Sequence, residues 1–233
     1  MERSEQSKML RGELFDANDS ELLALRVQAK HLCYQFNHTD PADEAAQRDI
    51  LSRLIGRIRG QAMIMPNFWC DYGSNIELGD GVFINHDCVI LDGGKVTFGD
   101  NVLVGPQCGF YTASHPADAE TRRTGAEYSL PISIDAGVWI GGGVKVLPGV
   151  HIGENSIIAG GSVVTRDVPA NVLAGGVPCR VIRPLSAPEQ QPLPGMERFR
   201  AAHQEGWTPE HPAHQGADLQ APCASGRRGH PTA

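Results

Sequence analysis

The sequence predicts a mainly β protein: a parallel β-helix of hexapeptide repeats with a short N-terminal α-helical segment and a disordered C-terminal tail. The prediction rests on a six-residue apolar period in the middle of the chain, two amphipathic helical patterns before it and a compositional change after it. An α-helix repeats every ~3.6 residues and a strand alternates every ~2, so neither explains this period. Three hexads instead form one triangular coil, and stacked coils bury a continuous core.

The repeat is clearest over residues 132–167, which read as the hexads ISIDAG, VWIGGG, VKVLPG, VHIGEN, SIIAGG and SVVTRD. The first position of each hexad is apolar or small, and the third is always aliphatic. Gly, Asp and Asn follow the third position, where a tight corner requires unusual backbone dihedrals. The third-position residues are Ile134, Ile140, Val146, Ile152, Ile158 and Val164.

The same period runs upstream, with two interruptions. After a two-residue slip at Gly93-Gly94 it resumes, and it then disappears between Phe110 and Ile134, a gap of 24 residues. We expect residues 111–131 to form a loop, and loops of this length in a compact domain are usually functional. The upstream core positions are Leu78, Ile84, Ile90, Phe98, Val104 and Phe110.

Two helical patterns precede the repeats and define an N-terminal helical segment over residues 9–60. The first helix is expected from Ser20, because Leu22, Leu25, Ala29, Leu32 and Phe36 are spaced by three and four. The second is expected to open at Asp40-Pro41 and to close at Gly60, with an apolar face of Leu51, Leu54, Ile55 and Ile58. Residues 1–8 are expected to be disordered. Two helices cannot bury both apolar faces alone, so they should pack against the first coil.

The β-helix domain is expected over residues 61–186 and a disordered tail over 187–233. The last 47 residues contain seven of the sixteen prolines but only two Leu, Ile or Val residues. Such a segment cannot bury enough apolar area to offset its ordering entropy, so deletion of residues 190–233 should leave stability and cofactor affinity nearly unchanged.

Composition excludes several classes of partner. The net charge is −7 and no basic run is longer than a pair, which argues against nucleic acid. No apolar stretch approaches the ~18 residues of a membrane span, and the polar N-terminus lacks a signal peptide's apolar segment. The six cysteines are scattered without a CxxC pair, which predicts reduced thiols in a cytoplasmic protein.

Four residues stand out as candidates for chemistry, each with a simpler explanation beside it. His115 precedes Pro116 in the long loop, where it is either functional or a solvent-exposed loop residue. Asn85 and Asp92 follow core positions, where such residues often only form corners. Trp139 should point outward from the coil, and a large exposed aromatic favours a planar ligand or a subunit contact.

With these residues placed, the chain resembles the maltose/galactoside O-acetyltransferase family. The similarity spans roughly residues 9–183 and is carried by MLRGELFDANDSELLALR, CDYGSNIELGD, FINHDCVILD, YTASHP and the block from PISIDAG to GGVPCRVI. TASHP, VWIGG and AGGVPCRVI are far more specific than the hexads. The resemblance implies a left-handed β-helix, against the usual right-handed crossover rule.

The resemblance also implies the chemistry: direct transfer of an acetyl group from acetyl-CoA to a sugar hydroxyl, without an acyl-enzyme. It assigns His115 as the general base, which takes the hydroxyl proton as the oxygen attacks the thioester. It assigns Asn85 to transition-state stabilisation and acceptor contact. Further acceptor contacts map to Asp16 or Asn18, Asp71 and Asp92, because a carboxylate accepts several hydrogen bonds from sugar hydroxyls.

CoA contacts map to a second set, in which glycines allow the pantetheine arm to approach and arginines bind phosphates. The resemblance also implies a homotrimer with interfacial active sites, and it requires no metal. A single β-helix offers flat faces without a cleft, whereas two faces meeting at an interface form a groove. The CoA set is Trp139, Gly142, Gly160, Thr165, Arg166, Arg180 and Arg183.

Departures and alternatives remain. Galactoside-type members carry a second acidic residue where this chain has Gly93, and nothing in the spacing demands that Glu127 orient His115. The acceptor could instead be an antibiotic, an oligosaccharide or serine. A zinc lyase resembling the γ-class carbonic anhydrases would use His86, His115 and His151. A non-catalytic scaffold or sugar-binding protein is a third possibility.

Overall fold

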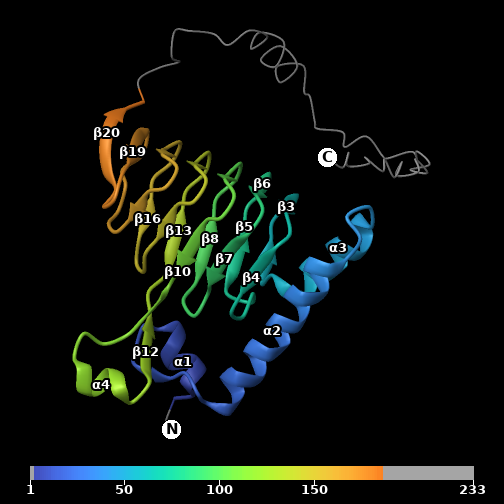
Figure 1. Ribbon diagram of the computed structural model, residues 1–233, viewed down its shortest axis with the longest axis vertical. Helices are drawn as coiled ribbons and strands as arrows, with labels where there is room; N and C mark the ends of the chain where they lie inside the picture. Colours follow the sequence, from blue (N-terminus) through green and yellow to red (C-terminus); the bar gives the residue numbers. More distant parts are fainter. Residues whose placement is uncertain (1–2, 186–233) are drawn as a thin grey trace, which may run out of the picture. The chain divides into compact units, whose positions relative to one another are not determined.

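The computed structural model describes residues 3–185, which form a parallel β-helix with helices at its N-terminal end (Figure 1). Six parallel strands stack on one face, which gives about six turns. The predicted solenoid with N-terminal helices is therefore confirmed. The tail prediction for residues 187–233 lies outside the described residues.

The coils have three faces, joined by corners that we name after the faces they connect. Face 1 consists of β2 (Arg57–Ile58), β5 (Ile76–Leu78), β8 (Val96–Phe98), β13 (Ile132–Ile134) and β16 (His151–Ile152). Face 2 consists of β3 (Ala62–Ile64), β6 (Val82–Ile84), β9 (Leu103–Val104), β14 (Trp139–Ile140), β17 (Ile157–Ile158) and β19 (Val172–Gly175), with β20 (Arg180–Pro184) added antiparallel. Face 3 consists of β4 (Phe68–Cys70), β7 (Cys88–Leu91), β10 (Gly109–Tyr111), β15 (Lys145–Val146) and β18 (Val163–Val164).

The hexad residues form the core as predicted. Every third-position residue of the 132–167 block is buried, and the rings of Phe98 and Phe110 meet edge to face at 5.0 Å. The two first-position serines are also buried, and each hydroxyl donates to a backbone carbonyl: Ser156 to Pro169 and Ser162 to Ala159. Small polar residues therefore fit these positions because a nearby backbone carbonyl, on the same or the next coil, supplies an acceptor.

The first predicted helix is confirmed, whereas the bounds of the second were wrong. α2 (Ser20–His38) is capped by Asp19 and packs against α3 and β4. α3 (Glu44–Leu54) begins later than predicted, because Asp40 accepts from the Ala42 amide in a turn and Asp43 is the actual cap. It also ends early, since Ile58 already lies in β2, a strand of face 1.

The prediction of disorder over residues 1–8 was wrong for the part that the structure describes. α1 (Glu5–Leu10) is capped by Ser4, and a Glu5 carboxylate oxygen accepts from the Asp16 amide at 2.6 Å. Met9 is buried in a small second core of Met9, Phe15, Ala17, Leu22 and Tyr72. The cap, the Glu5 carboxylate and one buried side chain thus hold a helix that has no visible apolar period.

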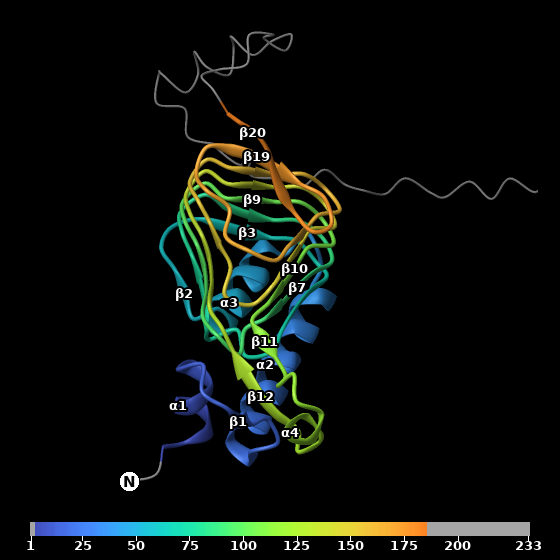
Figure 2. The ribbon, with the colours of Figure 1, turned by 90° about the vertical axis from the view of Figure 1, so that its left-hand side faces the viewer.

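The long loop over residues 111–131 is structured. It holds β11 (Ala113–Ser114), α4 (Ala119–Arg123) and β12 (Ala126–Ser129), and β12 pairs antiparallel with β1 (Phe15–Asp16) (Figure 2). The loop and the N-terminal segment therefore form one small sheet beside the solenoid. No helix in residues 3–185 has the length and apolarity needed to cross a bilayer.

Candidate active site

The predicted site residues fall on two corners of the coil. Corner 2–3, where the chain passes from face 2 to face 3, carries Asn85 after β6. Corner 3–1, where the chain leaves face 3, carries Asp71 after β4, Asp92 after β7 and the His115 loop after β10. The small sheet brings Asp16 to the same corner, because β1 pairs with β12.

His115 follows β11 and has an exposed side chain. Its Nδ1 lies 3.3 Å from the Ala126 carbonyl oxygen, and since a carbonyl only accepts, Nδ1 carries the proton. The neutral ring then presents an unprotonated Nε2, the form that a general base requires. Glu127 lies in β12 opposite Phe15, and the carbonyl of its neighbour Ala126, not its carboxylate, contacts the imidazole.

The side-chain amide of Asn85 uses its oxygen, but not its nitrogen, in a hydrogen bond within the corner. Its Oδ1 accepts from the His86 amide at 2.8 Å, and its own backbone amide donates to the Val104 carbonyl at 3.0 Å. The Oδ1 bond holds the side chain, and within residues 3–185 the Nδ2 amino group has no hydrogen-bond partner. A fixed, partly buried N–H donor is suited to an oxyanion.

Asp71 belongs to a charged cluster that links α2 to corner 3–1. Burial raises the pKa of its carboxyl, while the nearby cations of Lys30 and Arg26 lower it. Arg26 Nη1 donates to Tyr72 Oη at 2.6 Å, and its Nη2 donates to the Ala17 carbonyl. Arg26 thereby joins the backbone beside Asp16 to the corner beside Asp71.

Arg26 and Tyr72 were missed by the sequence reasoning. The available signal was position: Arg26 lies four residues after Leu22, on the edge of the face that α2 buries. A charged residue there must find partners. Its guanidinium also lies over the Tyr72 ring, 5.7 Å from the centroid.

Asp92, predicted to contact the acceptor, is surrounded by backbone amides. It is fully buried, and its Oδ1 accepts from the amides of Asp71 and Tyr72 at 3.0 and 2.8 Å. Its Oδ2 accepts from the Asn75 amide at 3.3 Å. Burial raises its pKa to about 6, opposed by the backbone hydrogen bonds. In this structure Asp92 holds the corner that carries Asp71, and no part of it is exposed to a substrate.

The absence of an acidic side chain at Gly93 has a steric basis. A Cβ at this position would lie 2.5 Å from Ser129 Oγ, closer than real Cβ contacts allow. Ser129 is itself buried, and its hydroxyl has no hydrogen-bond partner within the described part of the chain. A larger residue at position 93 therefore requires the Ser129 hydroxyl to rotate away or the β12 strand to shift.

The predicted CoA residues are also divided between corners. Trp139 projects from face 2 and is 53% exposed, with exposed Gly142 and Gly160 on the adjoining corner 2–3. A Cβ on Gly160 would lie 3.1 Å from the Gly142 carbonyl oxygen, so glycine keeps this corner flat. Exposed Arg180 and Arg183 lie on β20 at the end of face 2, whereas Thr165 and Arg166 follow β18 on corner 3–1.

Asn85 and His115 do not meet within one chain. Asn85 precedes β7, whereas His115 follows β10, which pairs in parallel with β7. The four residues of β7 span roughly 13 Å at about 3.3 Å per residue, so a full strand separates the two side chains. One copy of the chain therefore carries the predicted site residues in two groups at different corners, which we call half sites.

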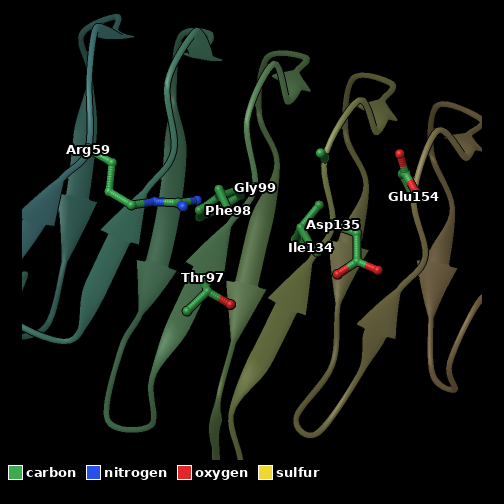
Figure 3. Close-up of a pocket in the computed structure, with 8 residues that line it drawn as sticks. Arg59, Thr97, Phe98, Gly99, Ile134, Asp135 and Glu154 are labelled. Carbon is green, nitrogen blue, oxygen red and sulfur yellow. The ribbon is translucent and has the colours of Figure 1, made fainter.

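A cavity of about 350 Å³ lies on the third corner, between faces 1 and 2, and none of the predicted site residues lines it (Figure 3). Arg59, Asp135 and Glu154 line it beyond the ends of face 1 strands, together with Thr97 within β8. His151 lies on face 1 next to it, 2.8 Å from Asp135, whereas His86 lies on corner 2–3. Among residues 3–185, no group of three or more His, Cys, Asp or Glu side chains could hold a metal ion.

Two segments of the chain match models of known protein families. Residues 8–60 match the maltose acetyltransferase hexapeptide capping motif, and residues 131–166 match the six-repeat bacterial transferase hexapeptide. Galactoside O-acetyltransferase of Escherichia coli K12 is 41% identical over 175 residues, 75% of this chain and 86% of that protein.

Two solved structures share the fold at high identity. A maltose O-acetyltransferase from Clostridium difficile 630 is 45% identical with a TM-score of 0.77, covering 79% of this chain and 98% of that one. A hexapeptide-repeat acetyltransferase from Vibrio cholerae O1 biovar eltor, complexed with acetyl-CoA, is 43% identical with a TM-score of 0.74. The match covers 79% of this chain and all of that chain, 100%.

Proposed function

The chain belongs to the maltose/galactoside O-acetyltransferase family of hexapeptide-repeat proteins, and on that premise we propose that it moves the acetyl group of acetyl-CoA to a sugar hydroxyl. The observation that carries the proposal is His115, whose Nδ1 is held by the Ala126 carbonyl so that Nε2 is available as a base. The capping motif over residues 8–60 favours a sugar acceptor over an antibiotic or serine, because it is the maltose acetyltransferase motif.

The residues present fit CoA. The flat glycine corner beside Trp139 accommodates an extended pantetheine arm, and the nearby arginines offer cations for phosphate groups. When bound, acetyl-CoA supplies the thioester acetyl group. His115 Nε2 takes the proton of the hydroxyl as its oxygen bonds to the acetyl carbon, and returns it to the thiolate released when the carbon–sulfur bond breaks. The Asn85 amide donates to the carbonyl oxygen that gains negative charge in between. No thiol of the protein takes part, and the five described cysteines are buried.

We propose that the two half sites combine across subunits of a homotrimer. The support is face 2, whose outward residues align in one ladder of apolar side chains. Three of them are large and 39–53% exposed, and a row of this kind usually marks a subunit interface. The ladder runs Met63, Phe83, Leu103, Trp139, Ile157 and Leu173.

The first experiment tests His115. His115→Ala should lower the turnover of acetyl transfer by about 10²–10⁴-fold, the usual contribution of general-base catalysis. CoA affinity, measured calorimetrically, should stay within about twofold. Thiol release from acetyl-CoA with a panel of sugars provides the assay. Near-normal turnover of His115→Ala, or an acetylated protein trapped by mass spectrometry without acceptor, would refute the mechanism.

The second experiment tests the shared site. His115→Ala and Asn85→Ala should each be strongly impaired on their own. When the two variants are mixed in equal amounts, unfolded and refolded, random assembly should restore both intact residues at about a quarter of the sites, with activity to match. Sedimentation should show a trimer, and Leu103→Glu should disperse it with loss of activity. A fully active monomer, or no recovery from co-assembled variants, would contradict the shared site.

A further inference from the structure

A second cavity, of about 650 Å³, lies between the C-terminal end of α2 and corner 2–3 of the first coils. We call it the outer cavity. Its walls include Asn37 and His38 of α2, Asp40 in the following turn, Gln47 of α3, and Met65 and His86 on the coil. Its volume is within the range of small-molecule sites, about 300–1,000 Å³.

The outer cavity adjoins the proposed reaction centre through His86. His86 directly follows Asn85, and the Asn85 Oδ1 accepts from the His86 amide at 2.8 Å. The His86 ring donates through Nδ1 to the Pro66 carbonyl on the coil below, which leaves Nε2 without that bond. The cavity therefore begins one residue along the chain from Asn85, so a ligand bound at Asn85 could extend into it.

Both walls of the outer cavity are held in fixed positions. The Asn37 side chain accepts from the Phe68 amide at 2.8 Å and donates to the Phe68 carbonyl at 3.0 Å, which ties the end of α2 to β4. A site formed by such walls does not have to be ordered by its ligand, so less binding free energy is lost on association.

The polar groups of the outer cavity are mainly hydrogen-bond acceptors. His38 donates through Nδ1 to the Tyr34 carbonyl at 2.8 Å, so its Nε2 is an acceptor, as is that of His86. Asp40 uses Oδ1 for the Ala42 amide at 2.9 Å and keeps a second oxygen. Gln47 contacts the Asp40 carbonyl only at 3.5 Å and is available in both roles.

The remaining wall is apolar, formed by Pro41, Met65 and Pro66. Among the described residues that line the cavity there is no Lys or Arg, so it offers no cation to a phosphate or carboxylate. Acceptors facing an apolar wall instead match a sugar ring, which has hydroxyl donors at its edge and C–H groups on its faces. A neutral, hydroxyl-rich ligand is therefore the class that fits.

We propose that the outer cavity binds the non-reacting ring of a disaccharide or glycoside acceptor, while the other ring is acetylated beside Asn85. This inference rests on the proposed function and makes it more specific. It predicts a preference for two-ring acceptors, determined by residues that do not contact the reacting atoms.

The test compares maltose with glucose as acceptors for wild type and the His38→Leu/Gln47→Leu double variant. Each lost hydrogen bond should lower kcat/KM for maltose by about 3–10-fold and leave the value for glucose within about twofold. Gln28→Leu, the same change at an exposed α2 position outside the cavity, is the matched control and should alter neither.

Maltose binding, measured calorimetrically in the absence of acetyl-CoA, separates this inference from the function. Maltose affinity that is lost in the double variant supports the cavity even if wild type acetylates no sugar, in which case the proposed function fails alone. Unchanged maltose affinity and kcat/KM in the double variant would overturn the inference. So would an equal loss for glucose and maltose, since that result indicates a structural role.

Discussion

Asp92 provides the sharpest test of whether a family-typical acidic residue binds substrate here or holds the backbone. Its two carboxylate oxygens accept from three backbone amides, those of Asp71, Tyr72 and Asn75. Asp92→Ala leaves all three without an acceptor, whereas Asp92→Asn keeps an oxygen for the two shorter bonds. A buried amide without a partner costs about 1–3 kcal/mol, and the two variants differ by two such amides. The free energy of unfolding of Asp92→Ala should therefore be lower than that of Asp92→Asn by about 2–6 kcal/mol.

The pH dependence of stability gives a second signature with a definite sign. Burial raises the pKa of folded Asp92 from its ordinary 3.8 to about 6, so between these values the folded protein binds a proton that the unfolded chain has released. The contribution of Asp92 to the free energy of unfolding therefore falls as pH rises from 4 to 6 and is constant above that. A shift of two pKa units corresponds to about 3 kcal/mol at most.

Urea unfolding followed by circular dichroism, at one fixed protein concentration from pH 4 to 7, measures both effects. The free energy of unfolding of wild type, relative to that of Asp92→Asn, should decline by up to about 3 kcal/mol from pH 4 to 7. The KM for the acceptor should be similar for the two proteins. A rise with pH would mean that the amide hydrogen bonds outweigh burial. A large increase in acceptor KM with unchanged stability would show that Asp92 binds substrate and refute the structural role.

Two further perturbations test the neighbouring half sites. Trp139→Ala should raise the KM for acetyl-CoA more than that for the acceptor, because the indole is exposed beside the glycine corner. Trp139→Phe should restore part of the loss. Equal effects on both substrates would place Trp139 in a subunit contact alone. Arg26→Met removes the link between the Ala17 carbonyl and Tyr72, so steady-state kinetics should show a higher acceptor KM. It also removes a cation that lowers the pKa of Asp71, so any acidic limb that depends on ionised Asp71 should move to higher pH, and an unchanged pH profile and KM would contradict this positioning role.

Much of the fold could be read from the sequence because its forces are local and periodic. A six-residue apolar period determines which side chains enter the core, and the residues that follow determine the corners, so the third-position residues from Ile134 to Val164 are buried as predicted. The spacing of Leu22, Leu25 and Ala29 likewise predicted α2 and the face of it that packs inward. Element boundaries were less accessible: whether Asp40 or Asp43 caps α3 depends on which amide each carboxylate reaches.

The sequence by itself also singled out His115, as the histidine in the one long break of the repeat, and the outward direction of Trp139. Only the tertiary structure decided what surrounds them. The pairing of β1 with β12 joins residues up to 112 positions apart, and the bond from Arg26 to Tyr72 joins residues 46 positions apart. Neither contact, nor the burial of Asp92, follows from a local sequence pattern. Such contacts depend on how the N-terminal helical segment, the long loop and the coil pack together. A polar side chain can bond only to groups that the folded backbone brings within reach.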